Sequence, residues 1–296
     1  MNDFPLPGSG QSVVAVPAPG VGIGNWAGSS SAALDDDGAF VIAYRVRHGQ
    51  DSENPVETVV ARSDDGERFT TVATLHKERF GAQSLEKPSL VHTDDGRWHL
   101  YVCPAAPAPS KHWWVDLLVA DDPEGLADAE ALTVFPGDEN TGVKDPLVQR
   151  TADGGWQAWI CCHLLDVPDE EDRMTTAYAT SDDGLEWRWH GTVLAPRSGM
   201  WDARGARVTA VLPDGRAAYD GRATKEENWF ERIGLARLTG KRPGELEQTS
   251  DDAAVDARYL DVVPLPDGGY RIYYEARLPD ESHELRTELV ALPRSS

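Results

Sequence analysis

The sequence predicts an all-β fold, a five-bladed β-propeller with four-stranded antiparallel blades. The main observation is a fragment that occurs five times, in which Asp-Gly precedes an apolar or alternating run. The glycines of these fragments, at positions 38, 96, 154, 215 and 268, are separated by 58, 58, 61 and 53 residues. Helical periodicity is scarce between them. Four-stranded units at this interval are typical of radial repetition, which protects strand edges.

Each repeat is expected to open with two strands that are joined by the Asp-Gly turn. Asp-Gly between two such runs is a strong hairpin signal, because the glycine accepts the positive φ of a primed turn. The second strands are expected at residues 40–44, 98–102, 156–160, 217–219 and 270–274.

A third strand follows in each repeat, and a fourth, outer strand follows in most of them. Third strands are expected at residues 58–61, 116–120, 176–179 and 233–236. An acidic turn separates the third and fourth strands at residues 63–69, and it recurs at residues 181–187. These turns are expected to be structural, with the aromatic residues Phe69 and Trp187 packing between blades.

The whole chain, residues 1–296, is expected to form one domain, because propellers of this length often fold as a single unit. Residues 13–16 are expected to add a strand that closes the ring with the last repeat. The predicted blades span residues 25–80, 81–138, 139–196, 197–250 and 251–296.

The charge of the chain argues against two classes of partner. The sequence has 50 acidic and 28 basic residues, with a formal net charge of -22. Such a charge repels phosphate backbones and anionic lipid, so neither nucleic acid nor membrane is expected as a partner. The start lacks the basic and apolar regions of a signal peptide, and no segment approaches the roughly 18 apolar residues of a membrane span. A cytoplasmic location is therefore predicted.

The three cysteines, Cys103, Cys161 and Cys162, do not indicate a metal or redox site. Their number is odd, two of them are adjacent, and no C-x-x-C pair occurs. Buried thiols that pack as small apolar groups are expected instead. No metal and no cofactor is predicted, and the sequence does not indicate an oligomeric state.

With five blades and these turns, the sequence resembles the five-bladed propeller glycosidases of the arabinanase, xylosidase and invertase-like families, with the mannoside phosphorylases as relatives. Residues 143–148 are similar to the Arg-Asp-Pro element of invertase-type enzymes, and residues 178–187 are similar to their third-strand turn. Residues 86–89 and 44–45 are similar to phosphorylase elements. The resemblance implies a glycoside-active enzyme.

The chain departs from this family pattern at two places. Family members carry an aspartate at the start of the first blade, but residues 24–31 contain no carboxylate. At the start of the fourth blade, where family members have a glutamate that acts as the catalytic acid, this chain has Asp202.

The predicted site follows from the position of the hairpins. If all Asp-Gly turns lie at one face, first strands begin and second strands end around the axis at the opposite face. The predicted site residues there are Asn25, Trp26, Arg45, Glu86, Asp145, His163, Trp201, Asp202, Arg204, Asp220, Arg222, Arg258, Asp261, Tyr274 and Glu275, with Arg47 and Lys144 beside them. Both charge signs together with aromatic rings suit a small carbohydrate or sugar-like ligand.

Three of these residues are predicted to be catalytic, because glycoside cleavage needs carboxyl groups in different environments. Asp202 is predicted as general acid, Glu86 as base or nucleophile, and Asp145 as the residue that orients them. The alternative is that these carboxylates only pair with basic residues and tie the blades together. The other predicted site residues are expected to bind substrate; for His163 a structural hydrogen bond is an alternative. The tryptophans at 113 and 114 are expected to cover the pocket or to form an oligomer contact.

The sequence thus favours a hydrolase of a small glycoside or oligosaccharide. One alternative is an inverting phosphorylase in which Arg45, Arg47, Arg204 and Arg222 clamp phosphate. Another is a non-hydrolytic propeller that binds a sugar or metabolite or serves a biosynthetic pathway. An interaction scaffold is a further alternative, and it would require a large exposed apolar patch.

Overall fold

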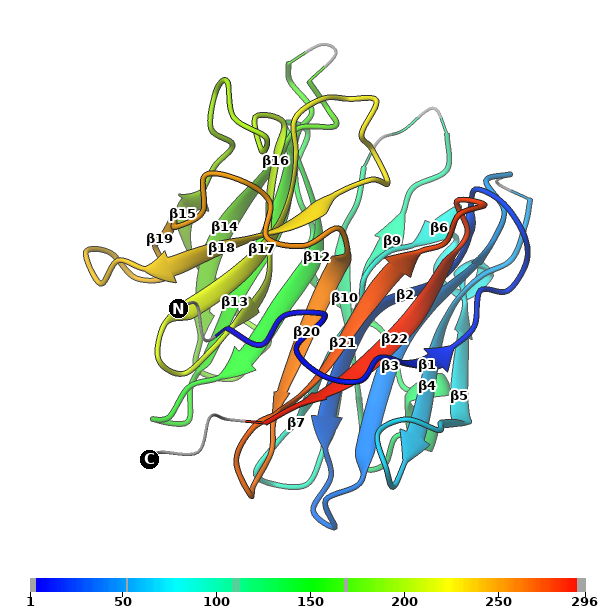
Figure 1. Cartoon of the computed structure of the whole chain (residues 1–296). Coiled ribbons are helices and arrows are strands. Elements are labelled where there is room, and N and C mark those ends of the chain that lie inside the picture. The colour runs from blue at the N-terminus through cyan, green and yellow to red at the C-terminus, as the bar shows by residue number, and fades with distance from the viewer. Residues whose placement is uncertain (1–3, 52, 109, 111, 168–169, 292–296) are drawn as a thin grey trace.

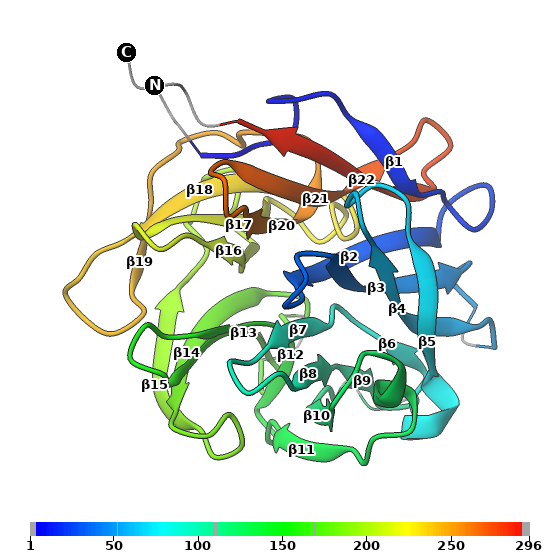
Figure 2. The same ribbon diagram turned by 90° about the horizontal axis from the view of Figure 1, so that it is seen from below.

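The computed structural model describes residues 4–51, 53–108, 110, 112–167 and 170–291. The all-β prediction is confirmed, since the described elements are strands apart from two short 3₁₀ helices, η1 (Lys77–Phe80) and η2 (Glu124–Ala127). No described helix is long and apolar enough to cross a membrane. Viewed from below, the strands are arranged in groups around a common centre (Figure 2).

Among the described residues, the antiparallel pairs form five groups of four strands. Group 1 contains β2 (Asn25–Leu34), β3 (Phe40–His48), β4 (Val56–Ser63) and β5 (Thr70–His76). Group 2 contains β7 (Ser89–His92), β8 (Trp98–Val102), β10 (Val115–Ala120) and β11 (Leu132–Phe135). Group 3 contains β12 (Thr141–Arg150), β13 (Trp156–Leu164), β14 (Met174–Ser181) and β15 (Arg188–Leu194).

The last two groups contain the C-terminal strands and the first strand of the chain. Group 4 contains β16 (Gly205–Val211), β17 (Arg216–Arg222), β18 (Arg232–Leu238) and β19 (Leu246–Gln248). Group 5 contains β20 (Arg258–Pro264), β21 (Tyr270–Arg277), β22 (His283–Val290) and β1 (Val13–Val16). The short strands β6 (Ser84–Leu85) and β9 (Pro104–Ala105) form a separate pair. Because β1 pairs with β22, the two ends of the chain meet in one group.

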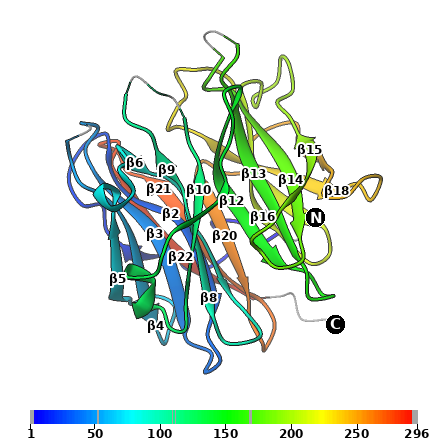
Figure 3. The same cartoon turned by 180° about the vertical axis from the view of Figure 1, so that it is seen from behind.

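The predicted Asp-Gly hairpins join the first two strands of every group. Their glycines have φ angles between 81° and 90°, the left-handed region that a side chain disfavours. All five hairpins are at the same end of the molecule, and longer connections are at the other end (Figures 1 and 3).

Consecutive groups are held together by apolar side chains that they share. Each of five buried clusters draws its members from two neighbouring groups, including a cluster between group 5 and group 1. Hydrogen bonds also join neighbouring groups. The Tyr101 hydroxyl of group 2 donates to the carbonyl of Gly184 in group 3, and the Tyr273 hydroxyl of group 5 donates to the carbonyl of Gly66 in group 1. The acidic turns therefore have the predicted structural role.

The turn aromatics and the cysteines also follow the prediction. The ring of Trp187 is 5.0 Å from that of Phe135 in group 2, and the ring of Phe69 is 6.0 Å from that of Tyr273 in group 5. The three cysteines are buried free thiols.

Candidate active site

A cavity of about 320 Å³ opens at the end of the strands opposite the Asp-Gly hairpins. All five strand groups or their connections contribute side chains to its wall. The charged wall residues are Arg45, Arg47, Lys144, Arg207, Arg222, Lys225, Arg258, Glu86, Glu171, Asp172 and Glu231. Trp26, Trp113, Trp229, His163 and Tyr259 add aromatic surface. The predicted convergence of side chains at this face is thus present.

Irregular backbone in the first strand of several groups controls which side chains reach the axis. The pairing register shifts in β2, β12, β16 and β20. Ser29, Asp145 and Tyr259 lie at three of these shifts with φ angles of 49°, 49° and 53°. A bulge of this kind re-aims the side chain at its extra residue. Here it turns Asp145 and Tyr259 toward the centre.

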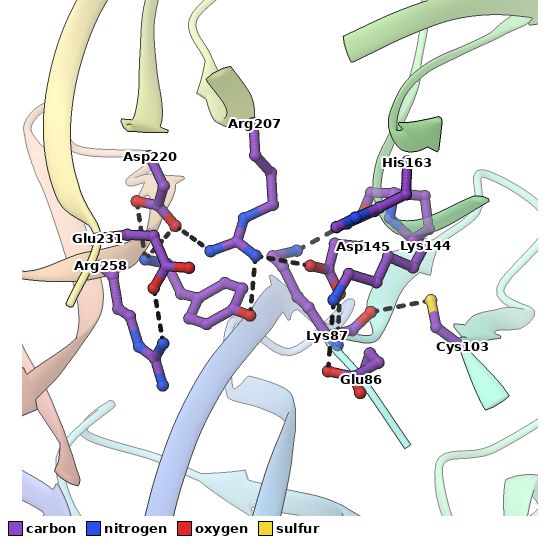
Figure 4. Close-up of polar contacts among 12 residues, drawn as sticks. Glu86, Lys87, Cys103, Lys144, Asp145, His163, Arg207, Asp220, Glu231 and Arg258 are labelled. Atoms are coloured by element: carbon purple, nitrogen blue, oxygen red, sulfur yellow. Dashed lines mark hydrogen bonds and ion pairs between the residues drawn. The ribbon is translucent and has the colours of Figure 1, made fainter. Parts of the chain in front are cut away.

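Arg207 is the centre of one buried network (Figure 4). Its Nη1 donates to Asp145 Oδ2 at 2.8 Å and to the Tyr259 hydroxyl at 3.0 Å, and its Nη2 donates to Asp220 Oδ2 at 2.7 Å. The other Asp145 oxygen accepts the backbone N–H of Lys87 at 2.9 Å. The charge of a buried guanidinium is thus balanced by two buried carboxylates, as the cost of burying charge requires.

These two aspartates differ in their proton affinity. Burial tends to raise the pKa of Asp145, but Lys144 and Arg207 outweigh burial and hold this pKa below its usual value. Burial raises the pKa of Asp220 to about 6, although Arg207 opposes the rise. Asp145 is therefore ionised at neutral pH, and Asp220 is the weaker acid.

A second buried network surrounds Glu231. Its carboxylate accepts from Arg222 at 3.0 Å and from Arg258 at 2.8 Å, and Arg258 Nε also donates to Glu275 at 2.7 Å. Burial opposes ionisation of Glu231, but Arg258 and its neighbouring guanidinium groups dominate and lower its pKa. Burial likewise opposes ionisation of Glu275, yet Arg258 and His283 lower its pKa to about 2. Both glutamates are therefore anions at neutral pH.

Glu86 lies on the other side of the cavity with a different set of partners. Its Oε2 accepts from Arg45 Nη1 at 2.8 Å and lies 3.9 Å from Lys144 Nζ. The Glu86 side chain is 12% exposed, whereas that of Asp145 is fully covered. Glu86 is therefore the carboxylate of the predicted catalytic set that a bound ligand can touch.

His163 presents an acceptor to the cavity. Its Nδ1 is 2.7 Å from the carbonyl oxygen of Glu171, so Nδ1 carries the hydrogen and Nε2 is unprotonated. Burial and the nearby Lys144 lower the pKa of His163 to about 3, which keeps the ring neutral. Nε2 is buried without a partner among the described residues, and the ring packs 5.1 Å from that of Trp113.

The structure brings most of the predicted site residues together. Trp26, Arg45, Glu86, His163, Arg222 and Arg258 line the cavity. Asp145, Asp220 and Glu275 lie directly behind it and bind the arginines of its wall.

Asp202 does not meet Glu86 and Asp145, contrary to the expectation. Its buried carboxylate accepts from Arg197 Nε at 2.9 Å and from the Tyr219 hydroxyl at 2.7 Å. The reason is that β16 begins only at Gly205, so Asp202 belongs to the preceding turns and packs behind Gly221 of β17. Trp201 packs there as well, against Tyr219.

Four other predicted residues also bind elsewhere. The Asn25 amide donates to the carbonyls of Val21 and Gly22. Arg204 pairs with Asp172 and Glu170. Asp261 accepts a hydrogen bond from the N–H of Ala32 and lines a separate cavity of about 700 Å³ nearer the hairpins. The Tyr274 hydroxyl contacts Ser12 and Glu288.

Sequence reasoning missed Arg207, Tyr259 and Glu231 as site residues. Arg207 stands alone among apolar residues in a predicted inner strand, and a charge in such a run is a signal for a buried ion pair. Tyr259 follows the predicted Arg258, but only the bulge turns it inward. Trp113 also lines the cavity, which agrees with one of the two roles that were open for it.

Comparisons with known proteins identify the class of the fold. No protein-family model matches the sequence, and no curated protein matches it. Solved structures do: a thermostable family-43 glycoside hydrolase matches with a TM-score of 0.67 and 13% identity, over 96% of this chain and 97% of that one. A β-1,2-mannobiose phosphorylase from Listeria innocua matches with a TM-score of 0.64 and 15% identity, over 91% and 90%.

An α-L-arabinofuranosidase from Lactobacillus brevis matches with a TM-score of 0.64 and 14% identity, over 89% of this chain and 90% of that one. The chain therefore has the propeller-type fold of glycoside hydrolases and mannoside phosphorylases, in agreement with the resemblance in its sequence.

Proposed function

We propose that the chain is a glycoside-active enzyme, a hydrolase that cleaves a small glycoside or oligosaccharide in the 320 Å³ cavity. The observation that carries the proposal is the composition of this cavity. Five strand groups contribute ionised carboxylates, guanidinium donors and three indole rings to one small space. Charged groups hydrogen-bond sugar hydroxyls, and indole faces stack on sugar C–H surfaces.

Glu86 is the proposed general base or nucleophile. It touches the cavity, and the hydrogen bond from Arg45 at 2.8 Å fixes the position of its carboxylate. Asp145 is a positioning residue, because its fully covered carboxylate contacts Arg207 and the backbone of Lys87 rather than the cavity. This agrees with the orienting role predicted for it.

Tyr259 is the proposed proton donor in place of Asp202. The phenol oxygen accepts from Arg207, so its own hydrogen is available to a leaving group in the cavity. Burial raises the pKa of Tyr259 and keeps the phenol protonated at neutral pH, although Arg207 opposes the rise. The guanidinium groups of Arg207, Arg258 and Arg45 lie 4.0, 5.2 and 5.8 Å from the ring centroid, where they stabilise the phenolate that forms.

The test is the turnover of aryl glycosides by the wild type and by Glu86→Gln. β-Mannosides and α-L-arabinofuranosides are the first substrates to use, because proteins with this fold act on these sugars. Loss of a catalytic carboxylate is expected to lower kcat by roughly 10²- to 10⁴-fold with an unchanged circular dichroism spectrum. Equal kcat values for the two proteins would exclude a catalytic role for Glu86.

An inverting phosphorylase is the second candidate. The observation that favours it is the group of cations around Glu86, which includes Arg45, Arg47 and Lys144. The larger phosphate clamp expected from the sequence is not available, since Arg204 and Arg222 are paired with carboxylates. Turnover that requires inorganic phosphate and releases a sugar phosphate would establish this candidate.

A non-hydrolytic binding protein is the remaining alternative, and the missing carboxylate of the first repeat is its main support. The space beside β2 is filled from another group: a Cβ atom at Gly28 would lie 2.3 Å from Oε2 of Glu275. A wild type that binds sugars but releases no product from any substrate would favour this alternative.

We also propose that the five strand groups are the blades of a closed five-bladed propeller, with the predicted blade boundaries and one domain. The apolar cluster and the Tyr273 bond that join group 5 to group 1 support closure. Cooperative unfolding in a single transition is the expected result for one domain. The cytoplasmic location is part of this proposal and is tested by cell fractionation.

A further inference from the structure

The charges around the cavity are divided unevenly between its two sides. On one side, the guanidinium groups form ion pairs with a larger number of carboxylates. These guanidinium groups belong to Arg207, Arg222 and Arg258, and the carboxylates to Asp145, Asp172, Asp220, Glu231 and Glu275. On the other side, Arg45, Arg47 and Lys144 lie around the carboxylate of Glu86, and Arg45 also lies 4.0 Å from Oε2 of Glu275. This positive side belongs to a chain with a formal charge of -22.

Two cations of the positive side lack a close carboxylate partner. Arg47 donates to the carbonyls of Gly49 and Gln50 and forms no ion pair among the described residues. Lys144 Nζ reaches Glu86 only at 3.9 Å, and Arg45 holds the same oxygen at 2.8 Å. Positive charge that is partly withdrawn from water and only partly neutralised attracts an anion.

Each of these two cations lies over an indole ring. The Arg47 guanidinium is 5.5 Å from the centroid of Trp26, and Lys144 Nζ is 5.2 Å from the centroid of Trp113. Trp26 is buried, whereas Trp113 is partly exposed. A sugar ring that packs against Trp113 brings a charged substituent within reach of Lys144. Inorganic phosphate has no apolar face, so it would leave the exposed part of Trp113 unused.

We propose that the substrate is an anionic sugar whose carboxylate or phosphate substituent binds Arg47 and Lys144. This inference rests on the proposed function of the cavity as a sugar site and names the class of sugar. The wall supplies charge-assisted hydrogen bonds to the substituent, and Trp113 supplies the stacking surface. Specificity arises because a neutral sugar offers these two cations no anionic substituent to bind.

Calorimetric titration of the complete chain with four ligands tests the proposal. The ligands are glucuronate, glucose 6-phosphate, glucose and inorganic phosphate. At least one of the two acidic sugars is expected to bind about tenfold or more tightly than glucose, and its affinity is expected to fall with added salt. In Arg47→Gln/Lys144→Gln this preference over glucose is expected to disappear, because the acidic sugars lose the two cations that bind their substituent.

Arg62→Gln is the matched control, since Arg62 pairs with Asp35 near the hairpins and is exposed. The control is expected to keep the preference for the acidic sugar. Equal affinities for glucose and both acidic sugars would overturn the proposal but not the sugar site. Inorganic phosphate that binds as tightly as the acidic sugars would also overturn it, in favour of free phosphate as the anion. Failure of every sugar to bind would overturn the proposed function as well.

Discussion

Replacing Tyr259 by phenylalanine removes one hydroxyl from the cavity and keeps the aromatic ring. The ring retains its contacts with Arg207, Arg258 and Arg45. The Arg207 nitrogen that loses its bond to the phenol still donates to Asp145 at 2.8 Å. The folded protein therefore loses one hydrogen bond without an orphaned charge, which costs about 1 kcal/mol of stability.

The expected kinetic effect depends on the leaving group of the substrate. For an alkyl glycoside, loss of the general acid is expected to lower kcat/KM by roughly 10²- to 10⁴-fold, or about 3 to 5 kcal/mol in the barrier. A dinitrophenolate departs without a proton, so the dinitrophenyl glycoside of the same sugar is expected to react at nearly the wild-type rate. The ratio of the two rates separates proton donation from a general structural defect.

The assay is a leaving-group series measured with wild type, Tyr259→Phe and Tyr219→Phe. Tyr219 is the control because it is also a buried tyrosine, but its hydroxyl donates to Asp202 outside the cavity. Tyr219→Phe is expected to be less stable than the wild type. Any change in its kcat/KM relative to wild type is expected to be the same for every leaving group. If Tyr259→Phe slowed both glycosides equally, or neither, its assignment as the proton donor would be refuted.

Three further predictions concern stability, each measured by denaturant unfolding. Arg207→Met removes the guanidinium group that two buried aspartates share, and the expected loss is about 3 to 5 kcal/mol. Gly28→Ala inserts a Cβ atom 2.3 Å from Oε2 of Glu275, and the expected loss of unfolding free energy from overpacking is about 1 to 3 kcal/mol. A denaturation midpoint equal to that of the wild type would mean that the glutamate moves freely. Burial raises the pKa of Asp261 to about 6. The protonated carboxyl therefore stabilises the fold below the unfolded-state pKa of Asp261, and this stabilisation, at most about 3 kcal/mol, is lost as pH rises through 6. In Asp261→Asn the free energy of unfolding should not show this decline.

The strand pattern and the hairpins could be predicted from the sequence because their causes are local. Asp-Gly has the backbone freedom that a primed turn needs, and the runs on either side have the composition of strands. The Ser-Asp-Asp-Gly turns close on themselves in the same way: the Ser63 hydroxyl and the Asp65 carboxylate accept the N–H groups of residues 66 to 68. No distant contact is needed to specify such elements.

The sequence also predicts the end of the strands at which the site lies, but it does not predict all the residues that line the site. Repetition indicates which strand ends meet, and Glu86, Arg45, Arg222 and Arg258, which it places together, line one cavity. A strand alternates its side chains between two faces, and a bulge of one residue exchanges those faces. Whether a bulge forms depends on the packing of the neighbouring strand, which one repeat does not encode.

The sequence by itself therefore determined the all-β class, the recurring hairpins and the end of the molecule at which charged groups gather. Only the tertiary structure decided that Arg207 and Tyr259 occupy the centre while Asp202 and Tyr274 turn away from it. The physical reason is that the direction of a side chain at an irregular strand position is set by long-range packing and by the pairing of buried charges. Local propensity sets the strands, and the balance of buried charge around the axis selects the residues that face the cavity.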